Sequence, residues 1–105
     1  MKVVNLGESN SVLNHFIAQM RDKSIQKDSM RFRRNLERVG EVFAYEISKT
    51  LEYEPVNVET PLGIAECQLH RKPIVLSTIL RAGLPLHQGL LNYFDNAENA
   101  FVAAF

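Results

Sequence analysis

The amino-terminal part of the chain carries hydrophobic positions at the spacing of α-helices. After a capping Asn10 or Ser11, one helical face is formed by Val12, Leu13, Phe16, Ile17 and Met20. This pattern predicts a helix that ends near Asp22, followed by a polar connection at residues 23–27.

A second, longer helical pattern follows the connection. Asp28 or Ser29 is a suitable cap, and the apolar stripe then consists of Phe32, Leu36, Val39, Phe43 and Ile47. The stripe runs out around Leu51, which sets the predicted end of this helix.

The second helix is also rich in arginine, at Arg31, Arg33, Arg34 and Arg38. One interpretation is a nucleic-acid patch. However, Glu37 and Glu41 follow Arg34 and Arg38 by three residues, a spacing that places opposite charges side by side on a solvated face. Because nucleic-acid binders usually carry net positive charge as well, we interpret the arginines as a solvated or subunit-contacting face.

After Pro55 the hydrophobic period changes to two, as in a β-strand. Residues 56–59 alternate apolar and polar side chains, residues 60–63 (Thr-Pro-Leu-Gly) have turn chemistry, and residues 64–69 extend again. We therefore expect a β-hairpin in which Thr60 serves the turn.

The remaining residues predict a strand, a helix and a second strand. The nearly unbroken apolar run from Ile74 to Leu80 is typical of a central strand buried on both faces. Pro85 suits the first turn of the helix, whose apolar stripe is Leu86, Leu90, Leu91 and Phe94. The segment Ala100 to Phe105 is the second strand, so we expect a βαβ unit with parallel strands. Because the chain stops inside this apolar strand, we expect it to be cut short.

Length, charge and cysteine content narrow the class of protein. A chain of 105 residues fits one domain, and 46% hydrophobic with 23% charged residues is typical of a globular protein. The formal net charge is +0, so we expect neither a nucleic-acid nor a membrane partner. With one cysteine, no signal peptide and no long apolar run, the predicted location is the cytoplasm.

Arg81, Ala82 and Gly83 lie where the predicted buried strand gives way to a helix. In open parallel sheets, ligands bind outside the carboxyl ends of the strands. A helix N-terminus offers free N–H groups there, glycine lets the backbone approach closely, and arginine matches phosphate oxygens. These features favour a pyrophosphate group, although an arginine and a glycine in one loop also occur without any ligand.

The histidines and the cysteine are weaker candidates for chemistry. His15, His70 and His87 lack the spacing of a helical metal site. Cys67 has no lysine or histidine directly beside it in the sequence that would activate its thiol. We expect surface or packing roles for all four, and no metal site.

Four stretches of the sequence carry a more specific signal: MRDK (20–23), VGEVFAYEISKTL (39–51), VNVETPLG (56–63) and ILRAGLPLHQGLL (79–91). In this order and at these spacings they resemble the amino-terminal half of uracil phosphoribosyltransferases. The pairing of VETPLG with ILRAGL is the most specific part of the resemblance.

The resemblance implies a function. That family transfers phosphoribose from phosphoribosyl pyrophosphate to N1 of uracil, giving UMP and pyrophosphate, with magnesium (Mg²⁺) on the polyphosphate. It implies that Arg81 binds the pyrophosphate and stabilises its charge, while Ala82 and Gly83 give backbone donors and turn geometry. It also implies a homo-oligomer formed through the amino-terminal helices.

By the same resemblance, residues 1–105 are the amino-terminal half of a type I phosphoribosyltransferase domain, an α/β fold. Residues 1–52 form a helical arm of two helices, residues 53–72 a β-hairpin, and residues 73–105 a βαβ unit of a parallel sheet with the pyrophosphate loop. The ribose 5-phosphate loop and the glycine-rich uracil segment of the family do not occur in this sequence, so we expect the chain alone to be inactive. The alternative is a non-catalytic module that dimerises and binds a phosphate or a nucleotide.

Overall fold

The amino-terminal part of the protein is helical, as the sequence predicts. The computed structural model describes residues 3–103, which begin with a short 3-10 helix η1 (Leu6–Glu8) followed by α1 (Leu13–Arg21) and α2 (Ser29–Ser48). The Ser11 hydroxyl accepts from the Leu13 N–H at 3.2 Å, and Asp28 caps α2 by accepting from the Arg31 N–H at 3.1 Å. α2 ends at Ser48, a few residues before the predicted end.

The connection between α1 and α2 is a turn organised by Asp22. Its carboxylate accepts hydrogen bonds from the Ser24 hydroxyl at 2.7 Å and the Ser24 N–H at 2.8 Å. The hydroxyl bond, followed by the N–H bond, lowers the pKa of Asp22 below its ordinary value because both favour the charged form. The carboxylate is exposed, so these bonds shape the turn without burying a charge.

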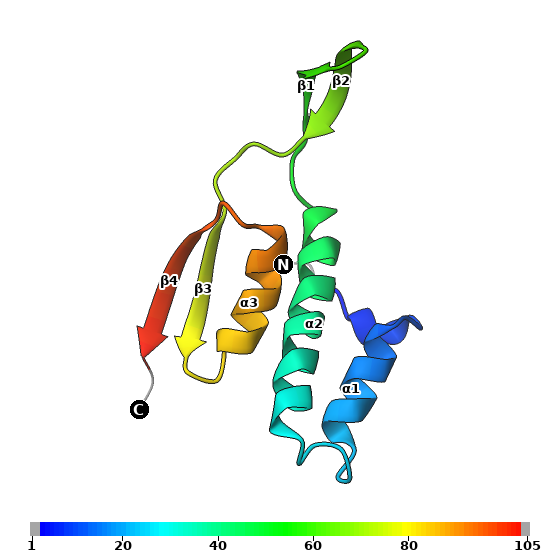
Figure 1. The fold of residues 1–105 in the computed structure, drawn as a ribbon, viewed down its shortest axis with the longest axis vertical. Helices are drawn as coiled ribbons and strands as arrows, with labels where there is room; N and C mark the ends of the chain where they lie inside the picture. The colour runs from blue at the N-terminus through cyan, green and yellow to red at the C-terminus, as the bar shows by residue number, and fades with distance from the viewer. Residues whose placement is uncertain (1–2, 104–105) are drawn as a thin grey trace.

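The predicted hairpin is present, with β1 (Glu54–Thr60) antiparallel to β2 (Gly63–Leu69). The Thr60 hydroxyl donates to the Gly63 carbonyl at 2.7 Å and accepts from the Leu62 N–H at 3.3 Å, which confirms its role in the turn. Gly63 has a φ of 135°, a conformation that favours glycine. In Figure 1 the hairpin projects beyond the end of α2, away from the other strands.

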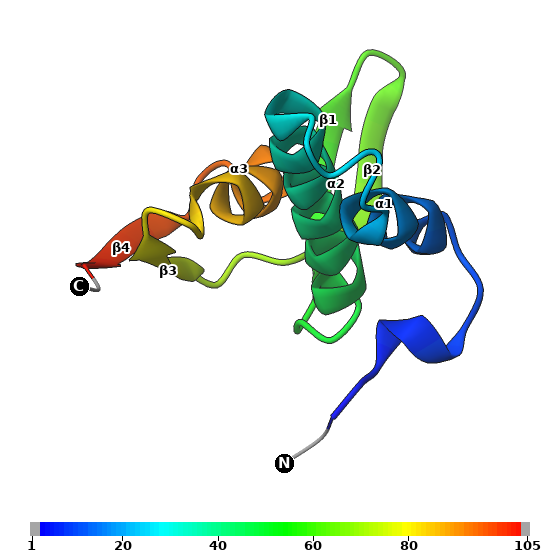
Figure 2. The ribbon, with the colours of Figure 1, turned by 90° about the horizontal axis from the view of Figure 1, so that it is seen from below.

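The predicted βαβ unit is confirmed as well. It consists of β3 (Val75–Leu80), α3 (Leu84–Tyr93) and β4 (Glu98–Ala103), and the two strands are parallel. Figure 2 shows α3 on one side of this two-stranded sheet, between the sheet and α2. Among residues 3–103, no helix reaches both the length and the hydropathy that a membrane crossing requires.

The burial on both faces that the sequence predicts for β3 is wrong. Leu76, on the side of α3, is buried, but Val75 is 61% exposed and Ile79 is 59% exposed. Successive side chains of a strand point to opposite faces, and α3 covers one face only. β4 is exposed over its full described length and starts at Glu98 instead of Ala100, while Phe105 lies outside the described residues.

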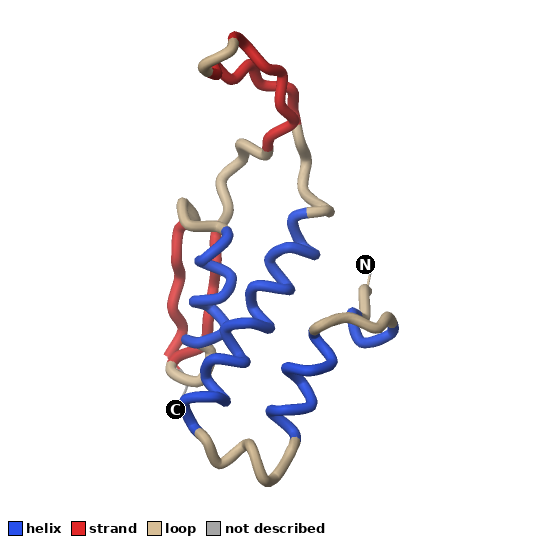
Figure 3. The backbone as a smooth tube through the Cα atoms, turned by 45° about the vertical axis from the view of Figure 1, so that its right-hand side comes forward, coloured by secondary structure: helices blue, strands red, loops and turns tan. Residues whose placement is uncertain are grey.

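α2 lies between α1 and α3 and packs against both (Figure 3). Its buried positions are Asn35, Val39, Gly40 and Ala44. Only Val39 among them belongs to the predicted stripe, whereas Phe32 and Ile47 are exposed. A helix with two partners buries a wider face than an amphipathic pattern shows, and small residues mark the side where the neighbour is closest.

The backbones of α2 and α3 come into direct contact at Gly40 and Gly89. We call this contact the seam. A Cβ atom at Gly40 would clash with the carbonyl oxygen of Leu86, and one at Gly89 would clash with that of Glu37. These neighbours are backbone atoms, which cannot rotate away. The seam therefore requires glycine at both positions.

Candidate functional site

Residues 81–83 form the loop between the carboxyl end of β3 and the first turn of α3. The Gly83 N–H donates to the Ile79 carbonyl at 3.0 Å, and the Leu84 N–H donates to the Arg81 carbonyl at 3.1 Å. The peptide bond between Leu80 and Arg81 is cis. In Figure 1 the loop lies at the same end of the molecule as the amino termini of α2 and α3.

Gly83 is needed for a steric reason. Its φ of −77° is available to any residue, but a Cβ atom there would clash with the Thr78 hydroxyl and lie 2.8 Å from the Ile79 carbonyl oxygen. Since the Gly83 N–H is already bonded to Ile79, this residue contributes turn geometry to the loop, and its own donor is occupied.

Arg81 and Ala82 supply the donors that remain available. Within residues 3–103, their two N–H groups have no backbone acceptor. They lie beside the amino terminus of α3, which carries the positive end of the helix dipole. Two unpaired amides at a helix N-terminus form a small site suited to an anion.

The side chain of Arg81 is also available. Arg81 is exposed, and the ion pairs found among residues 3–103 all involve other side chains. No carboxylate in this part of the chain neutralises its guanidinium. The predicted roles of Arg81, Ala82 and Gly83 in ligand binding remain predictions, but the geometry leaves the first two free to act.

A polar contact that the sequence hardly signals holds α3 on the sheet. His87 is 7% exposed, its ring Nε2 pairs with Asn99 Oδ1 of β4 at 2.7 Å, and its ring lies 5.3 Å from that of Phe101. This is a packing role, one of the two that the sequence predicts for this residue. A histidine in an otherwise apolar stripe, three residues into the helix, was the only available signal.

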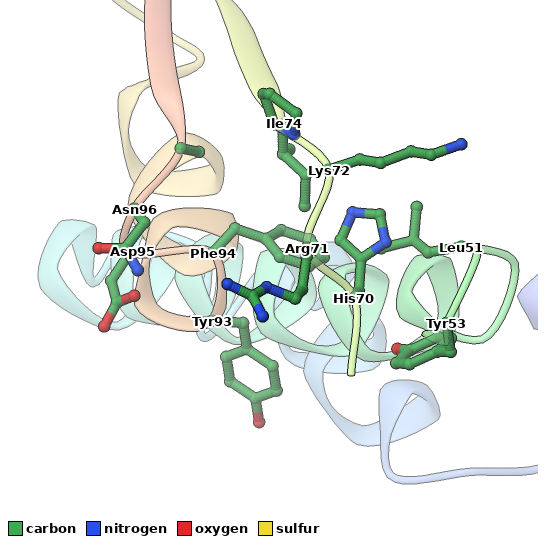
Figure 4. A pocket seen from close by; sticks show the side chains of 12 residues that line it. Leu51, Tyr53, His70, Arg71, Lys72, Ile74, Tyr93, Phe94, Asp95 and Asn96 are labelled. Atoms are coloured by element: carbon green, nitrogen blue, oxygen red, sulfur yellow. The ribbon is translucent and has the colours of Figure 1, made fainter. Parts of the chain in front are cut away.

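A different cavity, of about 460 Å³, lies between the base of the hairpin and the end of α3 (Figure 4). Its charged lining residues are Arg71, Lys72 and Asp95, and Lys72 is ion-paired with Glu52. The cavity adjoins the start of β3, whereas Arg81 follows the end of that strand. The hairpin-base cavity is therefore separate from the loop.

Metal ligands are not gathered at either place. Residues 3–103 contain no group of three or more His, Cys, Asp and Glu side chains arranged to hold a metal ion.

Comparison with known proteins decides the family. The family model described as uracil phosphoribosyltransferase matches residues 8–104. The chain belongs to the uracil phosphoribosyltransferase family. The resemblance carried by the four sequence stretches is thereby confirmed.

Individual uracil phosphoribosyltransferases agree with this match. The chain is 59% identical over 105 residues to the enzyme of that name from Porphyromonas gingivalis, covering 100% of the chain and 49% of the relative. It is 39% identical over 99 residues to that of Sulfolobus acidocaldarius, covering 91% of the chain and 45% of the relative. The chain therefore spans about half the length of the curated relatives it matches.

A solved structure shares the fold. The AQ2163 protein from Aquifex aeolicus superposes with a TM-score of 0.72 at 29% identity, over 89% of this chain and 44% of that chain. Together with the family match, the helices, antiparallel hairpin and parallel strands constitute a partial phosphoribosyltransferase fold. The predicted fold class is confirmed.

Proposed function

We propose that this chain provides the pyrophosphate-binding half of an enzyme that converts uracil and phosphoribosyl pyrophosphate to UMP and pyrophosphate. The observation that carries the proposal is the family match over residues 8–104, which includes the complete loop after β3. Among residues 3–103, no ion pair engages Arg81, and the N–H groups of Arg81 and Ala82 have no backbone acceptor. Such groups at a helix N-terminus suit a diphosphate.

The role of Arg81 follows from where charge develops in the reaction. As the bond between the ribose and the pyrophosphate breaks, negative charge builds up on the leaving diphosphate and the ribosyl carbon becomes cation-like. A guanidinium and N–H groups that are already in position stabilise this charge without rearrangement. Arg81 and the amides of Arg81 and Ala82 are the groups that do so, while Gly83 keeps the turn tight.

Magnesium enters this proposal as part of the substrate. The described residues provide no cluster of metal ligands, so we propose that Mg²⁺ arrives bound to phosphoribosyl pyrophosphate. Magnesium is commonly bound through substrate phosphates with few protein ligands. The Arg81 guanidinium then neutralises negative charge on the diphosphate that Mg²⁺ does not.

The proposed activity needs a second set of residues. The matched relatives are about twice as long as this chain, and the family's ribose 5-phosphate and uracil segments do not occur in it. The exposed face of the parallel sheet, with Val75, Ile79 and Val102, is available for further structure to pack on. We therefore propose that residues 1–105 alone do not turn over uracil.

The quaternary structure and the location are further proposals. We propose a cytoplasmic homo-oligomer that associates through the amino-terminal helices, where Val12, Met30 and Tyr45 are exposed. The free Cys67 is compatible with a reducing compartment. Light scattering on the purified protein measures the oligomeric state, and a monomeric mass at micromolar concentration would contradict the proposal.

The test of the function is Arg81→Ala in the full-length enzyme that contains this chain. Loss of one preorganised donor to developing negative charge lowers kcat by roughly 100-fold or more. Steady-state UMP formation measures this, and calorimetry with magnesium phosphoribosyl pyrophosphate measures binding. The matched control is Arg71→Ala in the hairpin-base cavity, which should leave both unchanged. Equal turnover and affinity in wild type and Arg81→Ala would remove the case for the loop.

A further inference from the structure

We propose that His87 is a positioning residue, which holds the loop at residues 81–83 in the shape that binds a diphosphate. His87 lies in the first turn of α3 and is 7% exposed. It acts through the side chain of Asn99 in β4 and through the backbone of Gly83, and not through contact with the ligand. This role rests on the proposed function of the loop and adds one residue to those that the function requires.

The hydrogen bond between His87 and Asn99 has a defined direction. The amide nitrogen of Asn99 donates to the Ala97 carbonyl at 3.3 Å, which leaves the amide oxygen for His87. An amide oxygen only accepts hydrogen bonds, so His87 Nε2 carries a hydrogen and donates it at 2.7 Å. The contact therefore requires a donor on α3 and an acceptor on β4, which an apolar pair does not supply.

This bond is the polar side-chain link between α3 and the parallel sheet. In the part of the chain that the structure describes, the other side-chain hydrogen bonds of α3 stay within the helix or run to α2. The ring of Phe101, whose centre lies 5.3 Å from that of His87, adds a second contact to β4. Asn99 and Phe101 are two positions apart in the strand, so they point to the same face of the sheet. His87 thus holds α3 against two neighbouring side chains of that face.

The backbone of His87 holds the loop. Its N–H donates to the Gly83 carbonyl at 2.9 Å, and the Gly83 N–H donates to the Ile79 carbonyl at 3.0 Å. Gly83 is thereby tied to α3 by its carbonyl group and to β3 by its N–H. Arg81 and Ala82, which carry the proposed donors, lie within the turn that these bonds close.

The shape of the loop depends on where α3 lies on the sheet. A Cβ atom at Gly83 would clash with the hydroxyl of Thr78, and Thr78 is the register partner of Phe101. The loop and the His87 ring therefore contact neighbouring positions of the same two strands. A helix that moves away from β4 takes Gly83 away from Thr78, and the donors of the loop move with it. Displacing binding groups by about 1 Å can slow a reaction by about 100-fold.

The test compares His87→Leu with His87→Gln in the full-length enzyme that contains this chain. Leucine keeps apolar bulk but has no donor, whereas the amide nitrogen of glutamine can replace Nε2 as the donor to Asn99. His87→Leu should raise KM for phosphoribosyl pyrophosphate by about tenfold or more. KM for uracil should change by less than about threefold, since the family's uracil segment lies outside this sequence. His87→Gln should keep both KM values within about threefold of wild type, because the hydrogen bond is restored.

A second variant removes the acceptor in place of the donor. Asn99 is exposed, so Asn99→Ala should fold, and it should also raise KM for phosphoribosyl pyrophosphate by about tenfold. Because His87 acts through Asn99, combining His87→Leu with Asn99→Ala should add less than about threefold to the effect of either change. A wild-type KM in Asn99→Ala, or effects that multiply in the double variant, would overturn the proposal.

The control removes a side-chain contact at the other end of α3. Asn92 donates to Glu37 Oε2 of α2 at 2.8 Å, and Asn92→Ala should leave both KM values within about threefold of wild type. The proposal is wrong if Asn92→Ala raises KM for phosphoribosyl pyrophosphate as much as His87→Leu does. It is equally wrong if His87→Leu and His87→Gln have the same KM for this substrate.

Hydrogen exchange separates this proposal from that of the function, because it does not depend on turnover. The amides of Gly83 and Leu84 make the bonds that close the loop. In His87→Leu they should exchange at least about tenfold faster than in wild type, and His87→Gln should restore the slow exchange. Unchanged exchange in His87→Leu would overturn the role of His87 even where Arg81→Ala is inactive. Wild-type kinetics in Arg81→Ala would instead remove the proposed function, and the exchange rates would still decide whether His87 orders the loop.

Discussion

The seam between α2 and α3 and the β1–β2 hairpin hold together in opposite ways. In the seam, two glycines let backbones touch, and added atoms would meet carbonyl oxygens. The hairpin is held by the backbone pairing of β1 with β2 and by its own turn. At its tip, Leu62 is 101% exposed and Ile64 is 75% exposed. We therefore expect a change in the seam to affect the whole body of the protein, and a change in the hairpin to remain local.

This difference matters for function because the loop at residues 81–83 leads directly into α3. The Leu84 N–H donates to the Arg81 carbonyl, so a shift of α3 away from α2 also moves Arg81. No comparable connection joins the tip of the hairpin to the loop. Four substitutions test the comparison.

The largest effect is expected for Gly89→Ala in the seam. The added methyl group meets the backbone of Glu37 and Glu41, and overpacking against rigid atoms costs about 3 kcal/mol. Urea unfolding followed by circular dichroism measures this loss. The control Gly7→Ala meets only the Asn5 side chain, at 3.1 Å, and should have a small effect. A Gly89→Ala protein as stable as wild type would show that the helices do not approach this closely.

The second effect is expected for Asn35→Ala, which removes the buried link between Gln19 and Arg38. Leaving the half-buried side chains of Gln19 and Arg38 without this hydrogen-bond partner costs about 1 to 2 kcal/mol, again measured by urea unfolding. Asn14→Ala on the exposed side of α1 removes a comparable side-chain bond, 3.3 Å long, to Asn10. That control should lose less than about 0.5 kcal/mol. Equal losses in the two variants would argue against a special role for the buried amide.

A smaller, local effect is expected for Gly63→Ala in the hairpin turn. At a φ of 135° a side chain is strained, and we expect a cost of about 1 kcal/mol. Hydrogen exchange should show faster opening of the β1 and β2 amides, with the unfolding midpoint of the helices unchanged. A loss of stability throughout the protein would show that the hairpin is coupled to the body after all.

The smallest effect is expected for Leu62→Ser at the tip of the hairpin. Leu62 is fully exposed, so its replacement should change the unfolding free energy by less than about 0.5 kcal/mol. Thermal unfolding of the two proteins side by side measures the difference. A clear destabilisation would mean that the tip is buried in solution, for example against another subunit.

Much of the secondary structure could be predicted because its signals are local. The cap at Asp28 and the turn at residues 60–63 depend on side chains a few positions apart, and both are found as expected. The position of the candidate loop also followed from local order, since an apolar run, Arg81, Gly83 and Pro85 come one after another. The family could also be predicted, because each of the four sequence stretches is a local motif and their order is read directly along the chain.

Which side chains are buried could not be predicted from such local signals. The stripe on α2 suggested Phe32 and Ile47, but Asn35, Gly40 and Ala44 are buried instead. Nothing in the pattern shows that α2 has a neighbour on each side, or that Gly40 meets Gly89 across a distance of many residues.

The order and type of the elements, the turn chemistry and the family all follow from the amino-acid sequence, because each depends on residues that are close along the chain. Packing in three dimensions sets which faces are buried. It also sets that, among residues 3–103, the Gly83 N–H donates to Ile79 while the N–H groups of Arg81 and Ala82 have no backbone acceptor. These properties depend on distances between segments far apart in the chain, which packing sets and periodicity does not encode.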